Sequence, residues 1–99
     1  MTITKQAAGS HLTIALEGRL DTGTAPQLEA EFNASLAGVT DLTVDMAKLA
    51  YLSSAGLRVL LAAQKKMNRQ GHMTVKNVCA DIMEVFEITG FVDILDIQE

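Results

Sequence analysis

The spacing of hydrophobic residues changes several times along this 99-residue chain, and this alternation limits the folds open to it. In residues 11–20, HLTIALEGRL, every second side chain is apolar from Leu12 to Leu16, which is typical of a strand with one buried face. Farther on, Leu28, Phe32 and Leu36 recur every four residues, as on one face of a helix. The repeated change predicts strands and helices packed around one core.

The remaining segments extend this pattern. Thr24 and Gln27 have the spacing of a capping box, and Gly71 and Gly90 are placed to end helices. A serine, Ser53 or Ser54, is placed to cap the middle helix. The expected elements are strands at 2–6 and 11–20, a helix at 24–38, a strand at 41–46, a helix from the serine pair to Gly71, a strand at 72–78, a helix at 81–91 with an inner stripe of Ile82, Val85, Phe86 and Thr89, and a short last strand within 92–98.

This order, β-β-α-β-α-β-α-β, predicts an α/β fold. Short connections between strands and helices imply a mainly parallel sheet, and the opening hairpin makes it mixed. We expect one domain over residues 1–99, with about five strands and three or four helices.

Composition excludes some classes of partner. The formal net charge is −4, which argues against nucleic acid as the main partner. The longest strongly apolar stretch, VLLAA, is far too short to span a membrane, so direct membrane insertion is not expected. The first residues, MTITKQ, lack an export signal, and we expect a cytoplasmic protein. Cys79 is expected to be a buried structural thiol or a poor helix cap.

A functional region is predicted at the carboxyl ends of the parallel strands, where function gathers in open α/β sheets. The loops LDTGTAP and AKLAYLSSAG should meet there. Asp21 and Thr22 should therefore lie near Ser53 and Ser54.

Catalytic chemistry finds no support at this edge. Neither serine has the G-x-S-x-G spacing of a hydrolase nucleophile, and His11 and His72 are not placed to act as a base. No metal-ligand spacing or phosphate-binding glycine loop is present, so no catalytic residue, metal or cofactor is predicted. Asp21 fits a loop or capping residue, and Asp45 fits a strand end. On spacing alone, a serine at a helix start is most often a simple cap.

One motif adds a second interpretation of the serines. The stretch DMAKLAYLSSAGLRVLL resembles the signature of STAS domains, specifically of the bacterial anti-sigma factor antagonists. EGRLDTGTAPQLE is similar to that family's second-strand loop, and VFEITGF to the end of its third helix. The resemblance runs from about Thr2 to Ile97, with elements and motifs in the same order.

The resemblance implies partner switching. The unmodified antagonist would bind an anti-sigma factor that is also a serine kinase, be released when that kinase phosphorylates it, and be restored by a metal-dependent serine phosphatase. The phosphoacceptor falls on Ser54 rather than Ser53, which stands where the family often has aspartate. Asp21 falls on the loop acid and Asp45 on the acid ending the third strand. The implied partner-binding residues are Asp21, Thr22, Ser53, Ser54, Gly56, Leu57 and Arg58.

A second reading of the resemblance stays open. STAS modules also act as scaffolds without phosphorylation, for example as an accessory subunit of a lipid-transporting ABC transporter. In that case the same helix start would be a static contact. The serine-rich loop favours the switch, because a static contact does not need a hydroxyl.

Overall fold

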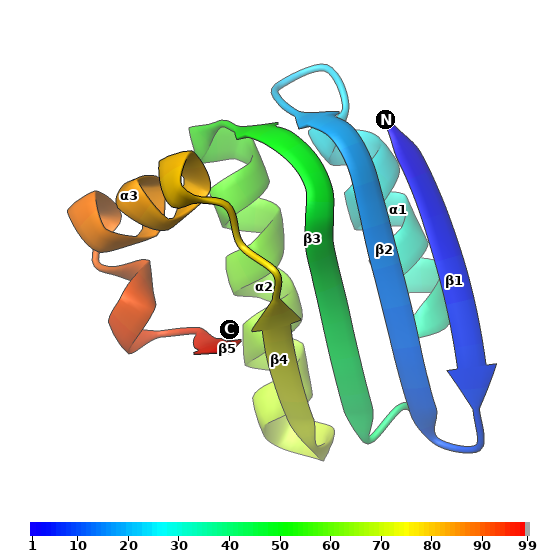
Figure 1. Ribbon diagram of the computed structural model, residues 1–99. Helices are drawn as coiled ribbons and strands as arrows, with labels where there is room; N and C mark the ends of the chain where they lie inside the picture. Colours follow the sequence, from blue (N-terminus) through cyan, green and yellow to red (C-terminus); the bar gives the residue numbers. More distant parts are fainter. Residues whose placement is uncertain (99) are drawn as a thin grey trace.

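The fold alternates strands and helices, as the sequence predicts (Figure 1). The computed structural model describes residues 1–98. The elements are β1 (Thr2–Ala8), β2 (His11–Leu20), α1 (Ala25–Ser35), β3 (Asp41–Leu52), α2 (Ser54–Gln70), β4 (His72–Lys76), α3 (Ala80–Thr89), the short 3-10 helix η1 (Phe91–Asp93) and β5 (Asp96–Gln98). The predicted order β-β-α-β-α-β-α-β is confirmed.

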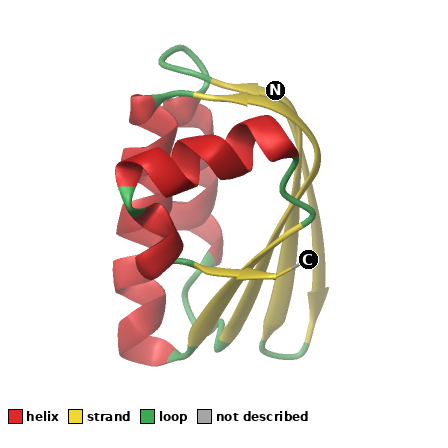
Figure 2. Ribbon diagram, turned by 60° about the vertical axis from the view of Figure 1, so that its left-hand side comes forward, coloured by secondary structure: helices red, strands yellow, loops and turns green. Residues whose placement is uncertain are grey.

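The strands form one five-stranded sheet in the order β1-β2-β3-β4-β5. Strand β1 pairs antiparallel with β2, and every later pair is parallel. This is the mixed, mainly parallel sheet that the sequence predicts. Figure 2 shows the helices on one side of the sheet, and within residues 1–98 no helix covers the other side.

The core lies between the sheet and these helices. In β2, Leu12, Ile14 and Leu16 are buried against the helices, whereas Thr13 and Ala15 are half-buried on the opposite face. The alternation of side chains along a strand produces this one-sided burial. Helix α2 supplies the central apolar face, including Leu57, Leu60 and Met67, while Leu61 is only half-buried.

Strand β3 is longer than the sequence predicts, because its pairing with β2 continues past two irregularities as far as Leu52. The register shifts twice, each time leaving one extra residue in β3. The buried side chains after Val44 are consequently Met46, Leu49 and Leu52, so the spacing changes from two to three. A β-bulge places an extra residue in one strand of a pair and so changes the spacing of its buried side chains. Strand β3 ends at Leu52, directly before the serine pair. Asp45 therefore lies inside β3, and the expectation that it ends the strand was wrong.

Details at the helix ends also differ from the expectations. The prediction of a capping box at the start of α1 was wrong. Thr24 makes no side-chain cap bond to the helix, and the Gln27 side chain donates to the main-chain oxygen of Met1. Helix α1 ends at Ser35, before Gly38. In α3, Thr89 is exposed rather than part of the inner stripe. Gly90 adopts the left-handed conformation (φ 80°) expected after a helix end.

Cys79 is exposed, so the expectation of a buried thiol was wrong. It occupies the cap position before α3 and makes no side-chain hydrogen bond to the helix. The alternative expectation, a poor helix cap, is confirmed.

Candidate functional site

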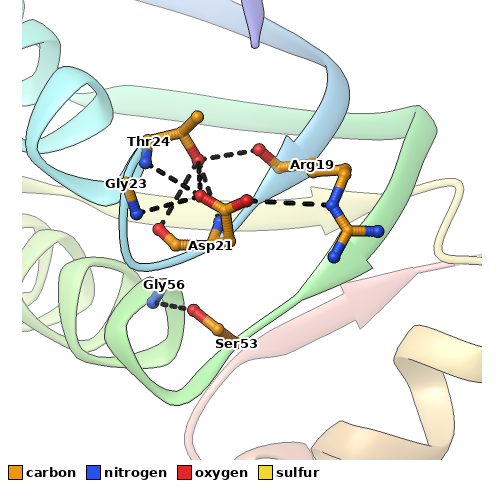
Figure 3. Close-up of polar contacts among 6 residues, drawn as sticks. All are labelled: Arg19, Asp21, Gly23, Thr24, Ser53 and Gly56. Atoms are coloured by element: carbon orange, nitrogen blue, oxygen red, sulfur yellow. Dashed lines mark hydrogen bonds and ion pairs between the residues drawn. The ribbon is translucent and has the colours of Figure 1, made fainter.

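The site is built where β2 and β3 end side by side. Leu20 and Leu52 are paired in the parallel register, and the main-chain N–H of Ser53 donates to the oxygen of Leu20 at 2.9 Å. The turn that follows β2, containing Asp21 and Thr22, therefore lies beside the start of α2, as the sequence predicts (Figure 3). A single residue, Ser53, joins β3 to α2.

The two serines have different roles in the structure. Ser53 is the cap of α2: its extended backbone places Oγ to accept a hydrogen bond from the N–H of Gly56 at 3.3 Å, and its main-chain oxygen accepts from the N–H of Leu57. Ser54 is the first residue of the helix and is exposed. Because Ser53 supplies the cap, the hydroxyl of Ser54 is not needed for it.

Asp21 is fixed by its own turn. Its Oδ1 accepts hydrogen bonds from the main-chain N–H groups of Gly23 and Thr24, both at 3.0 Å. The Thr24 hydroxyl donates to the main-chain oxygen of Arg19 at 2.7 Å and accepts from the N–H of Asp21 at 2.9 Å. Chiefly because of the Thr24 N–H, the pKa of Asp21 is lowered, and the carboxylate stays charged at neutral pH.

The other predicted residues divide between the surface and the core. Thr22 and Arg58 are exposed, whereas Gly56 and Leu57 are buried. A Cβ atom on Gly56 would come within 2.6 Å of a Leu20 side-chain carbon, so glycine is required there for close packing of α2 on the sheet. Gly56 and Leu57 therefore support the surface from below and do not present side chains to a partner.

Sequence reasoning missed one exposed pair beside this site. The guanidinium of Arg19 lies 4.1 Å from the centre of the Tyr51 ring, in the geometry of a cation–π contact. Arg19 Nε also lies 3.7 Å from Oδ2 of Asp21. Both residues immediately precede the paired Leu20 and Leu52, and the register shifts in β3 hid this relation from the sequence.

Asp45 lies elsewhere and has a structural role. Its Oδ1 accepts from the N–H of Ala47 at 2.9 Å and from the Asn77 amide at 3.0 Å. These bonds, the Asn77 amide first, lower its pKa. Asn77 itself has a positive φ of 60°, so the bond holds the connection that follows β4 in an uncommon conformation.

The part of the chain that the structure describes contains neither a metal-binding group nor a membrane-spanning helix. Among residues 1–98, no three His, Cys, Asp or Glu side chains are grouped closely enough to hold a metal ion. Within the same residues, no helix is both long and apolar enough to cross a bilayer.

Comparison with known proteins identifies the class. The model of the family described as "Mlab, STAS domain" matches residues 3–96, so the chain belongs to the STAS domain family. BtrV of Bordetella bronchiseptica, a candidate anti-sigma factor antagonist, is 35% identical, with 98% of this chain and 85% of that protein covered. The anti-sigma-B factor antagonist of Listeria monocytogenes is 30% identical, with 95% and 84% covered. Within the family, the chain groups with the anti-sigma factor antagonists.

A solved structure supports the same fold. The Bacillus cell fate determinant SpoIIAA in its phosphorylated form superposes with a TM-score of 0.76, covering 99% of this chain and 92% of that one. The identity is 18%, so this likeness concerns the fold alone. The fold class predicted from the sequence agrees with it.

Proposed function

We propose that the protein is a cytoplasmic anti-sigma factor antagonist, without catalytic activity of its own, that binds an anti-sigma factor with serine kinase activity. Phosphorylation of Ser54 by that partner releases it, and a metal-dependent serine phosphatase restores it. The observation that carries the proposal is the division of roles at the start of α2, where Ser53 makes the cap and Ser54 is exposed. In support, SpoIIAA, which shares the fold, has been solved in a phosphorylated form.

The domain is suited to accept a phosphate at this position. A phosphoserine adds about −1.5 to −2 charges at neutral pH. At the N-terminus of the 17-residue helix α2, the helix dipole favours such a charge. The main-chain N–H groups of Ser54 and Ala55 have no acceptor within the described residues, and the cap bond of Ser53 uses the N–H of Gly56 instead. Both groups are therefore free to bind a phosphate. The fold should therefore tolerate the modification.

A docked partner would not tolerate it equally well. The surface we propose consists of exposed or half-buried residues around Ser54, with the stacked Arg19 and Tyr51 at its border: Asp21, Thr22, Ser53, Ser54 and Arg58. Asp21 is already charged there. A phosphate buried against a partner beside this carboxylate would lose its water and repel a like charge. Release of the partner follows from that cost.

Phosphorylation by the cognate kinase tests the proposal. With ATP and kinase, one phosphate should be added, and peptide mapping should find it on Ser54. The Ser54→Ala variant should not be labelled, whereas Ser53→Ala, the matched control, should be. Labelling of Ser53 alone would show that the cap residue is the phosphoacceptor instead of Ser54. No label on either serine would refute the proposal.

Binding gives a second, independent readout. Ser54→Asp should weaken the complex with the unmodified partner by about 1–3 kcal/mol, through desolvation and repulsion of the new charge. Calorimetry that finds unchanged affinity would place the interface elsewhere. A pull-down also separates the switch from the scaffold reading, because the switch predicts a kinase and a phosphatase and the scaffold predicts a transporter ATPase.

A further inference from the structure

Exposed apolar side chains gather on one acidic segment of the surface. Of the four large hydrophobic residues that are exposed within residues 1–98, three lie between the last turn of α3 and the residue that follows η1. They are Ile88, Val92 and Ile94, exposed by 77%, 40% and 45%. We call residues 84–94, which turn from α3 into η1, the elbow; η1 contacts β5, and Figure 1 shows the elbow on the side of the molecule away from β1.

The elbow is an ordered part of the fold. The rings of Phe86 and Phe91 stack with centroids 6.5 Å apart, and Phe86 and Leu95 are buried in the core. The N–H groups of Ile94 and Leu95 both donate to the oxygen of Phe91, at 3.0 and 2.8 Å. With these side chains turned inward, Val92 and Ile94 are left on the outer side.

Charge is distributed just as unevenly. Residues 77–99 contain six acidic residues and no lysine or arginine, whereas residues 1–76 contain all eight basic residues and six acidic ones. Glu87 precedes Ile88, Asp93 lies between Val92 and Ile94, and Glu84 lies one turn before Ile88; none of these acids has an ion-pair partner among residues 1–98. The apolar side chains therefore stand in a strongly acidic setting.

Stability accounts neither for the charge of Glu87 nor for the exposure of Ile88. Glu87 lies in the last turn of α3, where the negative end of the helix dipole disfavours an acidic residue, and that turn has no basic residue. Ile88 likewise gains little from burial at its exposure of 77%. Both features suit a surface that is covered by something else.

We propose that the elbow is a second docking surface, beyond the one around Ser54, for a basic amphipathic helix of a protein partner. Leucine-type residues on such a helix would cover Ile88, Val92 and Ile94, and its lysines or arginines would pair with the surrounding carboxylates. A second copy of the chain fits less well, because two elbows brought together would place like charges opposite each other.

A peptide titration tests this surface in the intact protein. The probe is a 14-residue amphipathic helix of leucine and lysine, and the measurement is the shift of backbone amide signals by NMR. The shifts should map to residues 84–94, and a peptide with glutamate in place of lysine should cause none. Ile88→Ser should weaken binding by about tenfold or more, since it removes the most exposed apolar group. Tyr51→Ser, at the exposed apolar residue outside the elbow, is the matched control and should bind within twofold of the parent.

Charge is tested separately. The double variant Glu84→Gln with Glu87→Gln should weaken binding of the lysine peptide by several-fold while the melting temperature stays the same or rises. Ser54→Asp should leave peptide binding unchanged, so this test and that of the switch can fail independently. Shifts spread over the whole surface, or equal binding by Ile88→Ser, would overturn the proposal. So would sedimentation showing a dimer that Ile88→Ser dissociates, because the occupant would then be a second copy.

Discussion

Replacing Gly56 with alanine should destabilise the protein, although alanine is the better helix former. A Cβ at this position would lie 2.6 Å from Cγ of Leu20 and 2.8 Å from Cδ1 of Leu52. Ordinary carbon contacts are about 3.5–4.0 Å, so side chains or helix must move by roughly 1 Å. Leu20 and Leu52 are exposed by 0% and 5%, so neither can move into solvent.

The magnitude follows from two opposing effects. Overpacking of a core costs about 1–3 kcal/mol, and alanine in place of glycine in a helix returns at most about 1 kcal/mol. We therefore expect Gly56→Ala to lower the free energy of unfolding by about 1–2 kcal/mol. For a domain of this size, that corresponds to a fall in Tm of roughly 5–15 °C.

Urea denaturation followed by circular dichroism measures this loss, with an unchanged m-value indicating that only stability has changed. Gly23→Ala is the matched control, because a Cβ there would meet only Oδ1 of Asp21, at 3.4 Å, in an exposed turn. It should alter stability by less than about 0.5 kcal/mol. If Gly56→Ala is as stable as the parent or more stable, the packing explanation of this glycine is wrong.

Three further predictions concern the cap, a carboxylate and a helix connection. Ser53→Ala should cost about 0.5–1 kcal/mol, because its cap bond is long, whereas Ser54→Ala should change the free energy of unfolding by less than about 0.5 kcal/mol; urea titration of both tests this. The lowered pKa of Asp45 means that its charged form stabilises the fold above the ordinary pKa near 4, and that this contribution is lost as pH falls through the lowered value. Asp45→Asn should therefore flatten the acid limb of stability against pH, and a limb unchanged from the parent would contradict the assignment. Gln70→Ala should cost about 1–2 kcal/mol by thermal melting, because the Gln70 amide donates to two main-chain oxygens, those of residues 36 and 39, both at 2.6 Å.

The strands and helices could be predicted because their hydrophobic spacing is regular. Leu12, Ile14 and Leu16 alternate as the pairing of β2 requires, and the predicted order and sheet are those observed. The end of β3 could not be found in this way, because register shifts replace the alternation with a spacing of three. The length of the strand is set by its pairing with β2, which is a property of the folded sheet.

The site was predictable in its position and less so in its detail. A parallel register brings Asp21 beside Ser53 whatever the local turn, so topology alone sufficed. Which serine makes the cap depends on backbone angles, and the sequence left both open. The expectation for Thr24 failed because its hydroxyl is engaged by Arg19 and Asp21 in the preceding turn. The burial of Gly56 and Leu57 could not be predicted, because the residue type alone does not show whether a position faces a partner or the core.

The single residue between β3 and α2 has a mechanical consequence. Hydrogen bonds fix Ser53 to β2, through its N–H to the oxygen of Leu20, and to the first turn of α2, through its two oxygen atoms, so this connection is held on both sides. A phosphate added at the start of α2 would therefore not transmit its effect to distant parts of the protein through the movement of a loop. A partner would have to detect the modification by direct contact, because the chemistry of this corner changes while the backbone around it stays in place.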